Sequence, residues 1–198
     1  ETLFNNIFQI NPGEKLIVNS FIKKTKYWDY ENSIKSKRKL NNDELKNKFH
    51  NAIEKNLVSD VDVGTHLSGG IDSSMITTLA KKSNNFKAAF HGYFNNKDAE
   101  SELEYAEYIA RKKQIKLKKI SITNNDVINS IEKIIFSLDY PVAGPGSIPQ
   151  FLVSKEISSS VKVVLGGQGA DELFAGYIRY LLFYIEYLVN LEFGLGKK

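Results

Sequence analysis

The sequence predicts an α/β fold in which a parallel sheet carries helices on both faces and is preceded by a short β segment. The first observation is the alternation of short apolar strands with amphipathic helices after residue 41. The second is that these strands are four to eight residues long, which is typical of strands in a parallel sheet covered on both faces. Ligands bind such sheets at the carboxyl ends of the strands, so the loops after Leu67, Tyr93 and Leu165 are the expected sites.

The first forty residues have a different character. Residues 4–8, 15–18 and 26–28 are strand-like, and the turn Asn11-Pro12-Gly13 separates the first two of these segments. Residues 31–41 are polar, basic and aperiodic, so we interpret them as a linker. We therefore expect a boundary between residues 1–40 and residues 41–198.

The elements after this linker follow from caps and periodicity. Asn41 and Glu44 form a capping box that opens a helix with one apolar stripe to Leu57. The elements expected next are a strand at 61–67, a helix at 73–82, a strand at 86–93, a helix at 102–113, a strand at 116–122, a helix opened by Thr123 and Asp126, a loop at 141–149, a helix to about 158, a strand at 161–165 and a last helix from Glu172.

Composition excludes several classes of protein. With 42% hydrophobic and 25% charged residues the chain is an ordinary globular one, and with no cysteine it has no disulfide, thiolate zinc site or cysteine nucleophile. The net charge of +4 permits a nucleic-acid partner without arguing for one. The basic runs at 35–39 and 111–119 lack interleaved aromatics, so we interpret them as solvated faces and predict no nucleic-acid partner.

Two other features have ordinary interpretations. The apolar stretch 181–195 carries Glu186 and Glu192 and is too short to span a bilayer. We expect a core helix there, with a packing partner beyond Lys198, and no membrane association. His50, His66 and His91 show no metal-ligand spacing, so we interpret each as structural.

The loop after the strand at 61–67 has the composition of a phosphate site. Two glycines let the backbone turn tightly into a helix, so backbone N–H groups and the positive helix end converge. Ser68, Ser73 and Ser74 add hydroxyls, and Asp72 can hold Mg²⁺. The residues alone leave open an ordinary strand–turn–helix connection in which Asp72 caps the helix.

The loop after the strand at 161–165 repeats this pattern. Three glycines in residues 166–169 let the main chain lie against a flat or charged ligand, and Asp171 can be a second Mg²⁺ ligand. For Asp171 alone, N-capping is the simpler interpretation, with Glu172 favourable at the helix start. Two glycine–acid loops at the ends of two strands favour a nucleotide site.

These loops carry a family resemblance. Residues 68–74, SGGIDSS, resemble the SGGxDS loop of ATP pyrophosphatases of the adenine nucleotide alpha hydrolase-like (PP-loop) class. Residues 166–177, GGQGADELFAGY, resemble the signature of glutamine-dependent asparagine synthetases. Residues 139–149 are similar to that family's DEP-x-A-x-P-x-x-x-P loop, with Tyr140 in place of Glu, and residues 102–110 resemble its E-x-x-Y-A helix. Residues 4–16 and 26–28 look like the end of the family's glutaminase domain.

The resemblance implies a role for each matching residue. The β- and γ-phosphates of ATP would be held by Ser68, Gly69, Gly70, Asp72, Ser73 and Ser74. Mg²⁺ would be held by Asp72 and Asp171. The adenosine pocket would be lined by Leu67, Gly92, Gly166 and Gly167. Gln168 occupies the place of a Glu thought to assist the attacking ammonia, and residues 141–150 are the expected contact with the carboxylate substrate. An amide such as Gln cannot act as a general base, although it can orient an amine.

The implied function is that of a cytoplasmic ligase that forms a carbon–nitrogen bond. Aspartate would be activated by ATP as a β-aspartyl-adenylate and amidated, with release of AMP and pyrophosphate. The ammonia would come from glutamine through a glutaminase domain whose active-site cysteine this chain lacks, so we expect the fragment to be inactive alone. The alternatives are a relative acting on another carboxylate, and a non-catalytic ATP-binding remnant. An RNA-modifying member of the wider class is disfavoured by residues 169–177.

Overall fold

The structure is a computed structural model that describes residues 2–29, 32, 41–94, 100–139 and 146–192. Its contacts divide the chain into two compact units, Glu1–Lys48 and Phe49–Lys198. The division falls inside a helix, α2 (Asn42–Asn56). The predicted boundary between residues 40 and 41 stays a prediction.

The first unit contains an antiparallel hairpin. Strands β1 (Glu14–Val18) and β2 (Ile22–Lys26) pair from Glu14 opposite Lys26 to Val18 opposite Ile22. The amide of Phe21 donates to the Asn19 side chain at 3.0 Å in the turn. The prediction of a strand at 26–28 was wrong, since β2 spans Ile22–Lys26, and so was the prediction of a strand at 4–8. A turn replaces the strand because the Thr2 hydroxyl donates to the Ile7 carbonyl at 2.6 Å and folds this segment back.

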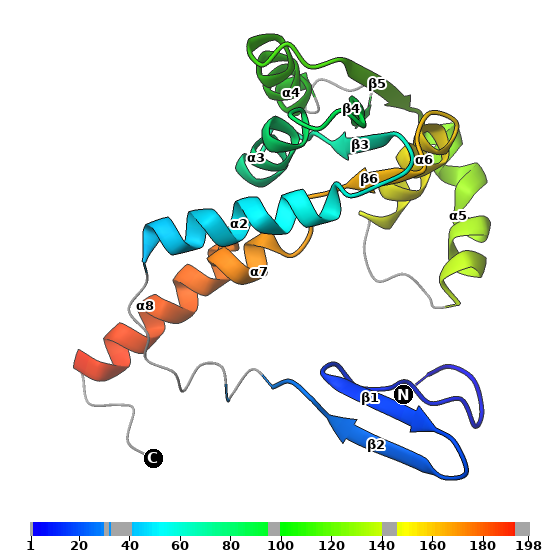
Figure 1. The fold of residues 1–198 in the computed structure, drawn as a ribbon, viewed down its shortest axis with the longest axis vertical. Coiled ribbons are helices and arrows are strands. Elements are labelled where there is room, and N and C mark those ends of the chain that lie inside the picture. The colour runs from blue at the N-terminus through cyan, green and yellow to red at the C-terminus, as the bar shows by residue number, and fades with distance from the viewer. Residues whose placement is uncertain (1, 30–31, 33–40, 95–99, 140–145, 193–198) are drawn as a thin grey trace. The chain divides into compact units, whose positions relative to one another are not determined.

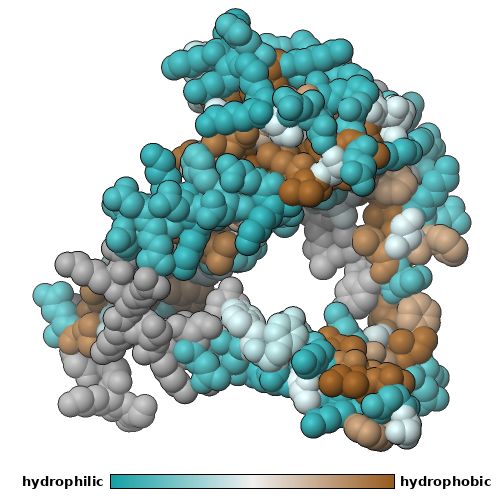
Figure 2. Space-filling model, viewed as in Figure 1, coloured by the Kyte–Doolittle hydropathy of each residue, from teal (hydrophilic) through white to brown (hydrophobic). Residues whose placement is uncertain are grey.

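The hairpin exposes apolar side chains and carries one defined ion pair. Figure 2 shows hydrophobic atoms on the surface of this unit, where Leu16, Val18 and Ile22 are exposed. The Lys24 ammonium lies 2.6 Å from the Glu14 carboxylate, and this hydrogen bond lowers the pKa of Glu14 below its ordinary value. An isolated hairpin of this size buries little apolar area, so its order depends on such local contacts.

Helix α2 begins where its cap predicts. The Asn41 side-chain oxygen accepts hydrogen bonds from the amides of Asp43 at 3.0 Å and Glu44 at 3.2 Å. These amides have no partner within the helix, so a side chain that accepts from them stabilises the helix start. The apolar stripe buries Ile53, while Ala52 stays exposed.

The second unit is built on the parallel sheet that the sequence predicts. Its four strands lie in the order β5-β4-β3-β6, and every neighbouring pair is parallel. The strands are β3 (Val63–His66), β4 (Phe86–Phe94), β5 (Leu117–Ile122) and β6 (Val163–Leu165). Figure 1 shows α3 (Ile71–Ala80) and α4 (Glu100–Lys112) on one face of the sheet and α5 (Asn124–Leu138) and α6 (Ser147–Ser158) on the other. The predicted α/β architecture is confirmed.

Each face of the sheet has its own apolar core. On the α4 side, Leu67 and Ala89 pack with Ala106, Ala110 and Ile115. The cluster on the α6 side contains Ala88, Phe90, Ile122, Val153, Ile157 and Val161. Because neighbouring residues of a strand face opposite sides, Ala88 and Phe90 belong to one core and Ala89 to the other. The carboxyl ends of β3 and β4 are thereby fixed from both faces.

The first residues of helices α5 and α6 show how local chemistry decides where a helix begins. The predicted capping box of α5 is present, since the Thr123 hydroxyl accepts from the Asp126 amide at 3.2 Å and the Asp126 carboxylate accepts from the Thr123 amide at 2.9 Å. Helix α6 begins at Ser147, within the segment predicted as a loop. Pro149 fits there because amides in the first turn need no helical partner.

The last predicted helix is two helices. Helix α7 (Ala170–Phe174) ends at Ala175, whose φ is 57°, and α8 (Ile178–Glu192) follows. A left-handed residue cannot continue a right-handed helix, so the chain turns there. None of the described residues of α8 is buried, and its expected packing partner stays a prediction. Within the described chain, no helix combines the length and apolar character needed to cross a bilayer.

Candidate nucleotide-binding site

The loop after β3 is held by a network of its own hydroxyls. The Ser68 amide donates to the Ser73 hydroxyl at 3.2 Å, and the Ser73 hydroxyl donates to the Gly70 carbonyl at 3.2 Å. The two hydroxyls of Ser68 and Ser73 lie 2.9 Å apart, and the Gly70 amide donates to the Ser68 hydroxyl at 3.3 Å. Since Ser73 gives its one proton to Gly70, Ser68 donates to Ser73. The loop is therefore ordered before any ligand binds.

Helix α3 presents its first turn uncapped. Its N-cap is Gly70, which has no side chain that could accept from the first-turn amides. Those amides have no partner within the helix and carry its positive dipole end, which favours an anion. Asp72 lies in this turn, and the Ser73 side chain is buried against the loop. The Ser74 hydroxyl is buried and is without a hydrogen-bond partner among the described residues.

The loop after β6 packs directly on this first turn. A β-carbon added at Gly167 would lie 3.2 Å from the Asp72 β-carbon and 3.3 Å from the Ser73 amide nitrogen. These are close contacts, so the absence of a side chain at Gly167 is what allows the approach. The two glycine–acid loops that the sequence singles out are brought together in space, because β3 and β6 are neighbours in the sheet.

A cavity of about 250 Å³ lies at the carboxyl ends of the central strands. Its lining includes six predicted site residues, namely Leu67, Ser68, Gly92, Gly166, Gly167 and Gln168. Gly146, Pro149 and Gln150, from the segment expected to contact the carboxylate substrate, also line it. Gly69, Gly70 and Asp72 follow Ser68 in the loop after β3 and the first turn of α3, and Asp171 lies in α7; these four residues are not among those that line the cavity. Tyr140 and residues 141–145 lie outside the described residues.

Sequence reasoning missed several residues that line this cavity. Phe90 and Val153 contribute apolar side chains from β4 and α6, and Glu102 contributes an acid from α4. His66 and His91 also line the cavity. We interpreted them as structural because they show no metal-ligand spacing. The available signal was their place in the chain, since His66 precedes Leu67 and His91 precedes Gly92, two predicted site residues.

Comparison with known proteins then decides the family. The sequence profile described as asparagine synthase matches residues 44–189. The chain belongs to the asparagine synthase family. It is 36% identical to asparagine synthetase [glutamine-hydrolyzing] 1 of Bacillus subtilis over 137 residues, which are 69% of this chain and 22% of that protein. It is 33% identical to asparagine synthetase [glutamine-hydrolyzing] 3 of Arabidopsis thaliana over 150 residues, 69% of this chain and 25% of that protein. The chain thus spans about a quarter or less of the curated relatives it matches.

Solved structures with a similar fold include two synthetases. One is a glutamine-dependent NAD+ synthetase from Acinetobacter baumannii in complex with ADP, with a TM-score of 0.47 and 18% identity, covering 79% of this chain and 32% of that one. The other is an NH3-dependent NAD synthetase from Campylobacter jejuni, with a TM-score of 0.45 and 23% identity, covering 70% of this chain and 61% of that one.

The segment that resembles the asparagine synthetase signature forms a tight corner between α7 and α8. The Tyr177 hydroxyl donates to the Glu172 carboxylate at 2.7 Å, and the Arg179 guanidinium lies 4.1 Å from the centre of the Tyr177 ring. This hydrogen bond lowers the pKa of Glu172 and raises the pKa of Tyr177 relative to their ordinary values. A β-carbon at Gly176 would overlap the Asp171 carboxylate oxygen. The Asp171 carboxylate therefore occupies the space that the absence of a side chain at Gly176 leaves.

The carboxylates of Asp72 and Asp171 are the candidate ligands for a metal ion that would also be coordinated by a bound phosphate. Among the described residues, no group of three or more His, Cys, Asp or Glu side chains is placed to hold a metal ion by itself. Asp72 lies against the second glycine loop, and Asp171 opens the helix that follows that loop. Mg²⁺ in nucleotide sites takes one or two carboxylates, substrate phosphates and water. This donor set fits Mg²⁺ bound together with a phosphate ligand.

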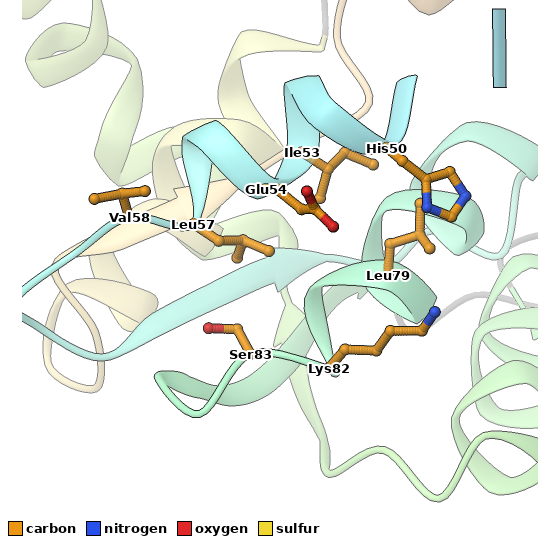
Figure 3. Close-up of a pocket in the computed structure, with 8 residues that line it drawn as sticks. All are labelled: His50, Ile53, Glu54, Leu57, Val58, Leu79, Lys82 and Ser83. Carbon is orange, nitrogen blue, oxygen red and sulfur yellow. The ribbon is translucent and has the colours of Figure 1, made fainter. Parts of the chain in front are cut away.

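Two further cavities contain fewer of the predicted residues. One of about 290 Å³ lies between α2 and the end of α3, and Figure 3 shows His50, Ile53 and Glu54 of α2, with Leu57 just after it, facing Leu79, Lys82 and Ser83. Another of about 320 Å³ is largely apolar and lies behind the second glycine loop, where it shares Gly166, Gly167 and Gln168 with the site. We take the cavity at the strand ends as the candidate site because six of the predicted residues line it.

Burial of His66 makes the stability of the chain depend on pH. Burial lowers the pKa of His66 below its ordinary value of 6.5, so the folded protein keeps this imidazole neutral. Below pH 6.5 the unfolded chain binds the proton that the folded chain excludes, so the free energy of unfolding falls as the pH falls through this window. Urea unfolding at pH 7.5 and pH 5.5 should show a smaller loss for His66→Gln than for the parent chain. An equal loss in both, with His50→Gln as the control, would contradict the prediction.

Proposed function

We propose that the cavity at the strand ends binds ATP, and that the whole protein is a glutamine-hydrolysing asparagine synthase that amidates aspartate. The observation that carries the proposal is the packing of Gly167 against Asp72, which joins two glycine–acid loops at one cavity. Family membership supports it, since the curated relatives are named asparagine synthetases. Because the chain spans so little of those relatives, the activity of the whole protein is part of the proposal.

Each part of the cavity has a role in this proposal. The uncapped first turn of α3 binds the β- and γ-phosphates through its backbone amides, next to the loop that the hydroxyls of Ser68 and Ser73 hold in place. The adenosine lies against Leu67, Gly92, Gly166 and Gly167, which line the cavity. Asp72 and Asp171 hold Mg²⁺, which supplies charge neutralisation for the phosphates when it is bound.

The residues then serve an acyl-activation reaction. A carboxylate is a poor acyl donor, and its attack on the α-phosphorus of ATP gives an acyl-adenylate, here β-aspartyl-adenylate, and releases pyrophosphate. The loop amides stabilise the negative charge that develops on the departing pyrophosphate. Ammonia attacks the acyl carbon, AMP leaves, and the amide remains. Gln168 orients the amine by hydrogen bonds, since its neutral side chain cannot take the proton of the ammonia.

The first unit belongs with the supply of ammonia. We propose that residues 1–40 are the last strands of a glutaminase domain, followed by a linker, and that residues 41–198 belong to the synthetase domain. The exposed apolar side chains of the hairpin, among them Leu16, Val18 and Ile22, support this assignment because a strand pair in a larger sheet would bury them. A relative acting on another carboxylate would use the same ATP site, so aspartate is the more specific part of the proposal.

Calorimetric titration with Mg-ATP tests the ATP site. The folded chain should bind Mg-ATP saturably, and Asp72→Asn should weaken the affinity about tenfold or more, because it removes one anionic ligand of the cation. The binding should also weaken when EDTA removes the magnesium. Asp60→Asn is the matched control, since Asp60 is exposed and lies before the amino-terminal end of β3, whereas the site lies at its carboxyl end.

Three outcomes separate the alternatives. Binding that Asp72→Asn loses and Asp60→Asn keeps supports the proposed site. Equal binding by all three proteins would contradict the role of Asp72. If the site binds Mg-ATP and the full-length protein forms no amide from aspartate and ammonia, the protein is a relative with another substrate or a non-catalytic ATP-binding protein, as the substitution at Gln168 permits.

A further inference from the structure

His91 makes a hydrogen bond that has no part in the function proposed above. It lies in β4, is 4% exposed and lines the cavity. Its Nδ1 lies 2.7 Å from the carbonyl oxygen of Leu67, the first residue after β3. A carbonyl oxygen only accepts hydrogen bonds, so Nδ1 carries the proton and donates. In the neutral imidazole, Nε2 is then an acceptor.

The peptide that His91 contacts is also held at its other edge. The Leu67 carbonyl and the Ser68 amide belong to one planar peptide unit. The carbonyl accepts from His91, and the amide donates to the Ser73 hydroxyl at 3.2 Å. A rotation of this unit would break both hydrogen bonds. Because it is the last peptide before the glycines, its orientation sets the direction in which the phosphate loop leaves the sheet.

Burying the His91 imidazole at this position has an energetic cost. Its Nε2 is buried and has no hydrogen-bond partner within the described part of the chain. A buried acceptor without a partner loses its hydrogen bonds to water and gains nothing in return. A phenyl ring would fill similar space without this loss. The gain that offsets it is the hydrogen bond to Leu67.

We propose that His91 is a positioning residue of the phosphate loop. This proposal rests on the proposed ATP site and concerns how the loop of that site is oriented before ATP binds. Through the Leu67 carbonyl, His91 fixes the peptide from which the Ser68–Gly70 loop departs, so the loop keeps its orientation toward the first turn of α3 when a phosphate ligand binds. The dependence on His91 should therefore be larger for ligands with phosphates than for adenosine, which does not reach the loop.

Two variants of the full chain separate this role from simple packing. His91→Phe keeps a flat ring and removes the donor, while His91→Asn keeps an N–H donor near the position of Nδ1. We expect His91→Phe to weaken Mg-ATP binding about 3- to 10-fold, the equivalent of one hydrogen bond, and His91→Asn to restore most of it. The affinity for adenosine, measured by NMR shift titration, should change less than about twofold from the parent in both variants. Urea unfolding should show that His91→Phe is as stable as the parent.

Each other outcome overturns the inference. Parent and His91→Phe chains that bind Mg-ATP equally well would leave the ATP site intact and remove the role of His91. An equal loss of Mg-ATP and adenosine affinity would show that His91 supports the whole cavity rather than the phosphate loop. Failure of His91→Asn to restore binding would show that the Nδ1 donor is not the reason. A folded parent chain that binds no Mg-ATP would refute the proposed function and this inference with it.

Discussion

Gly69→Ala should lower the free energy of unfolding by about 2–4 kcal/mol, from left-handed strain and overpacking together. Gly69 has φ of 91°, a conformation that an L side chain rarely adopts. An added β-carbon would lie 2.5 Å from the Tyr105 β-carbon and 2.8 Å from the Ala106 amide nitrogen. Backbone of α4 cannot move aside as a flexible side chain can, so the loop itself must shift. Urea unfolding measures the loss.

Gly70→Ala is the control for this prediction. Gly70 has φ of −66°, and its added β-carbon would meet nothing closer than the Ser68 hydroxyl at 3.4 Å. Its free energy of unfolding should stay within about 1 kcal/mol of the parent, since Ala fits the same backbone. If the two variants are equally stable, the contact between the loop and α4 does not hold the site. Mg-ATP binding by Gly69→Ala, measured below its unfolding transition, should fall below detection.

The parts of the fold that could be predicted from the sequence depend on neighbours in the chain. The helix after Thr123 was predicted because its capping pair, Thr123 and Asp126, lies three residues apart and is read directly from the sequence. The four parallel strands were predicted for the same reason, since apolar runs and glycine turns are local. Both glycine loops of the site follow such strands, and the sheet brings them together as expected from neighbouring strand ends.

The parts that could not be predicted depend on contacts that a local pattern does not contain. The apolar pattern runs on past Ala175, yet the left-handed backbone there ends α7 and starts a corner. Residues 4–8 were predicted as a strand, but a hydrogen bond from Thr2 to Ile7 turns this segment back. His91 has its partner at Leu67, which is 24 residues away along the chain. Only the pairing of β3 with β4 makes that contact possible.

Gly176→Ala should weaken Mg-ATP binding about tenfold or more, as is typical when a residue that orients a metal ligand is changed. The added methyl group would occupy the place of the Asp171 carboxylate oxygen and leave the rest of the corner largely in place. The Asp171 side chain can rotate away, so the free energy of unfolding should change little while the proposed Mg²⁺ ligand is misplaced. Calorimetry with Mg-ATP, beside titration of ATP in EDTA, measures the effect, which should appear only with magnesium.

A double-mutant comparison decides whether Asp171 carries this effect. In an Asp171→Ala background the carboxylate is gone, so Gly176→Ala should cost no further Mg-ATP affinity. Additive losses would mean that the methyl group disturbs the corner by another route, for example through Tyr177 and its hydrogen bond to Glu172. Non-additive losses would make Gly176 the residue that leaves room for the metal-binding carboxylate. Gly176 and Asp171 would then act together, because the absence of a side chain at Gly176 matters only while the Asp171 carboxylate is present.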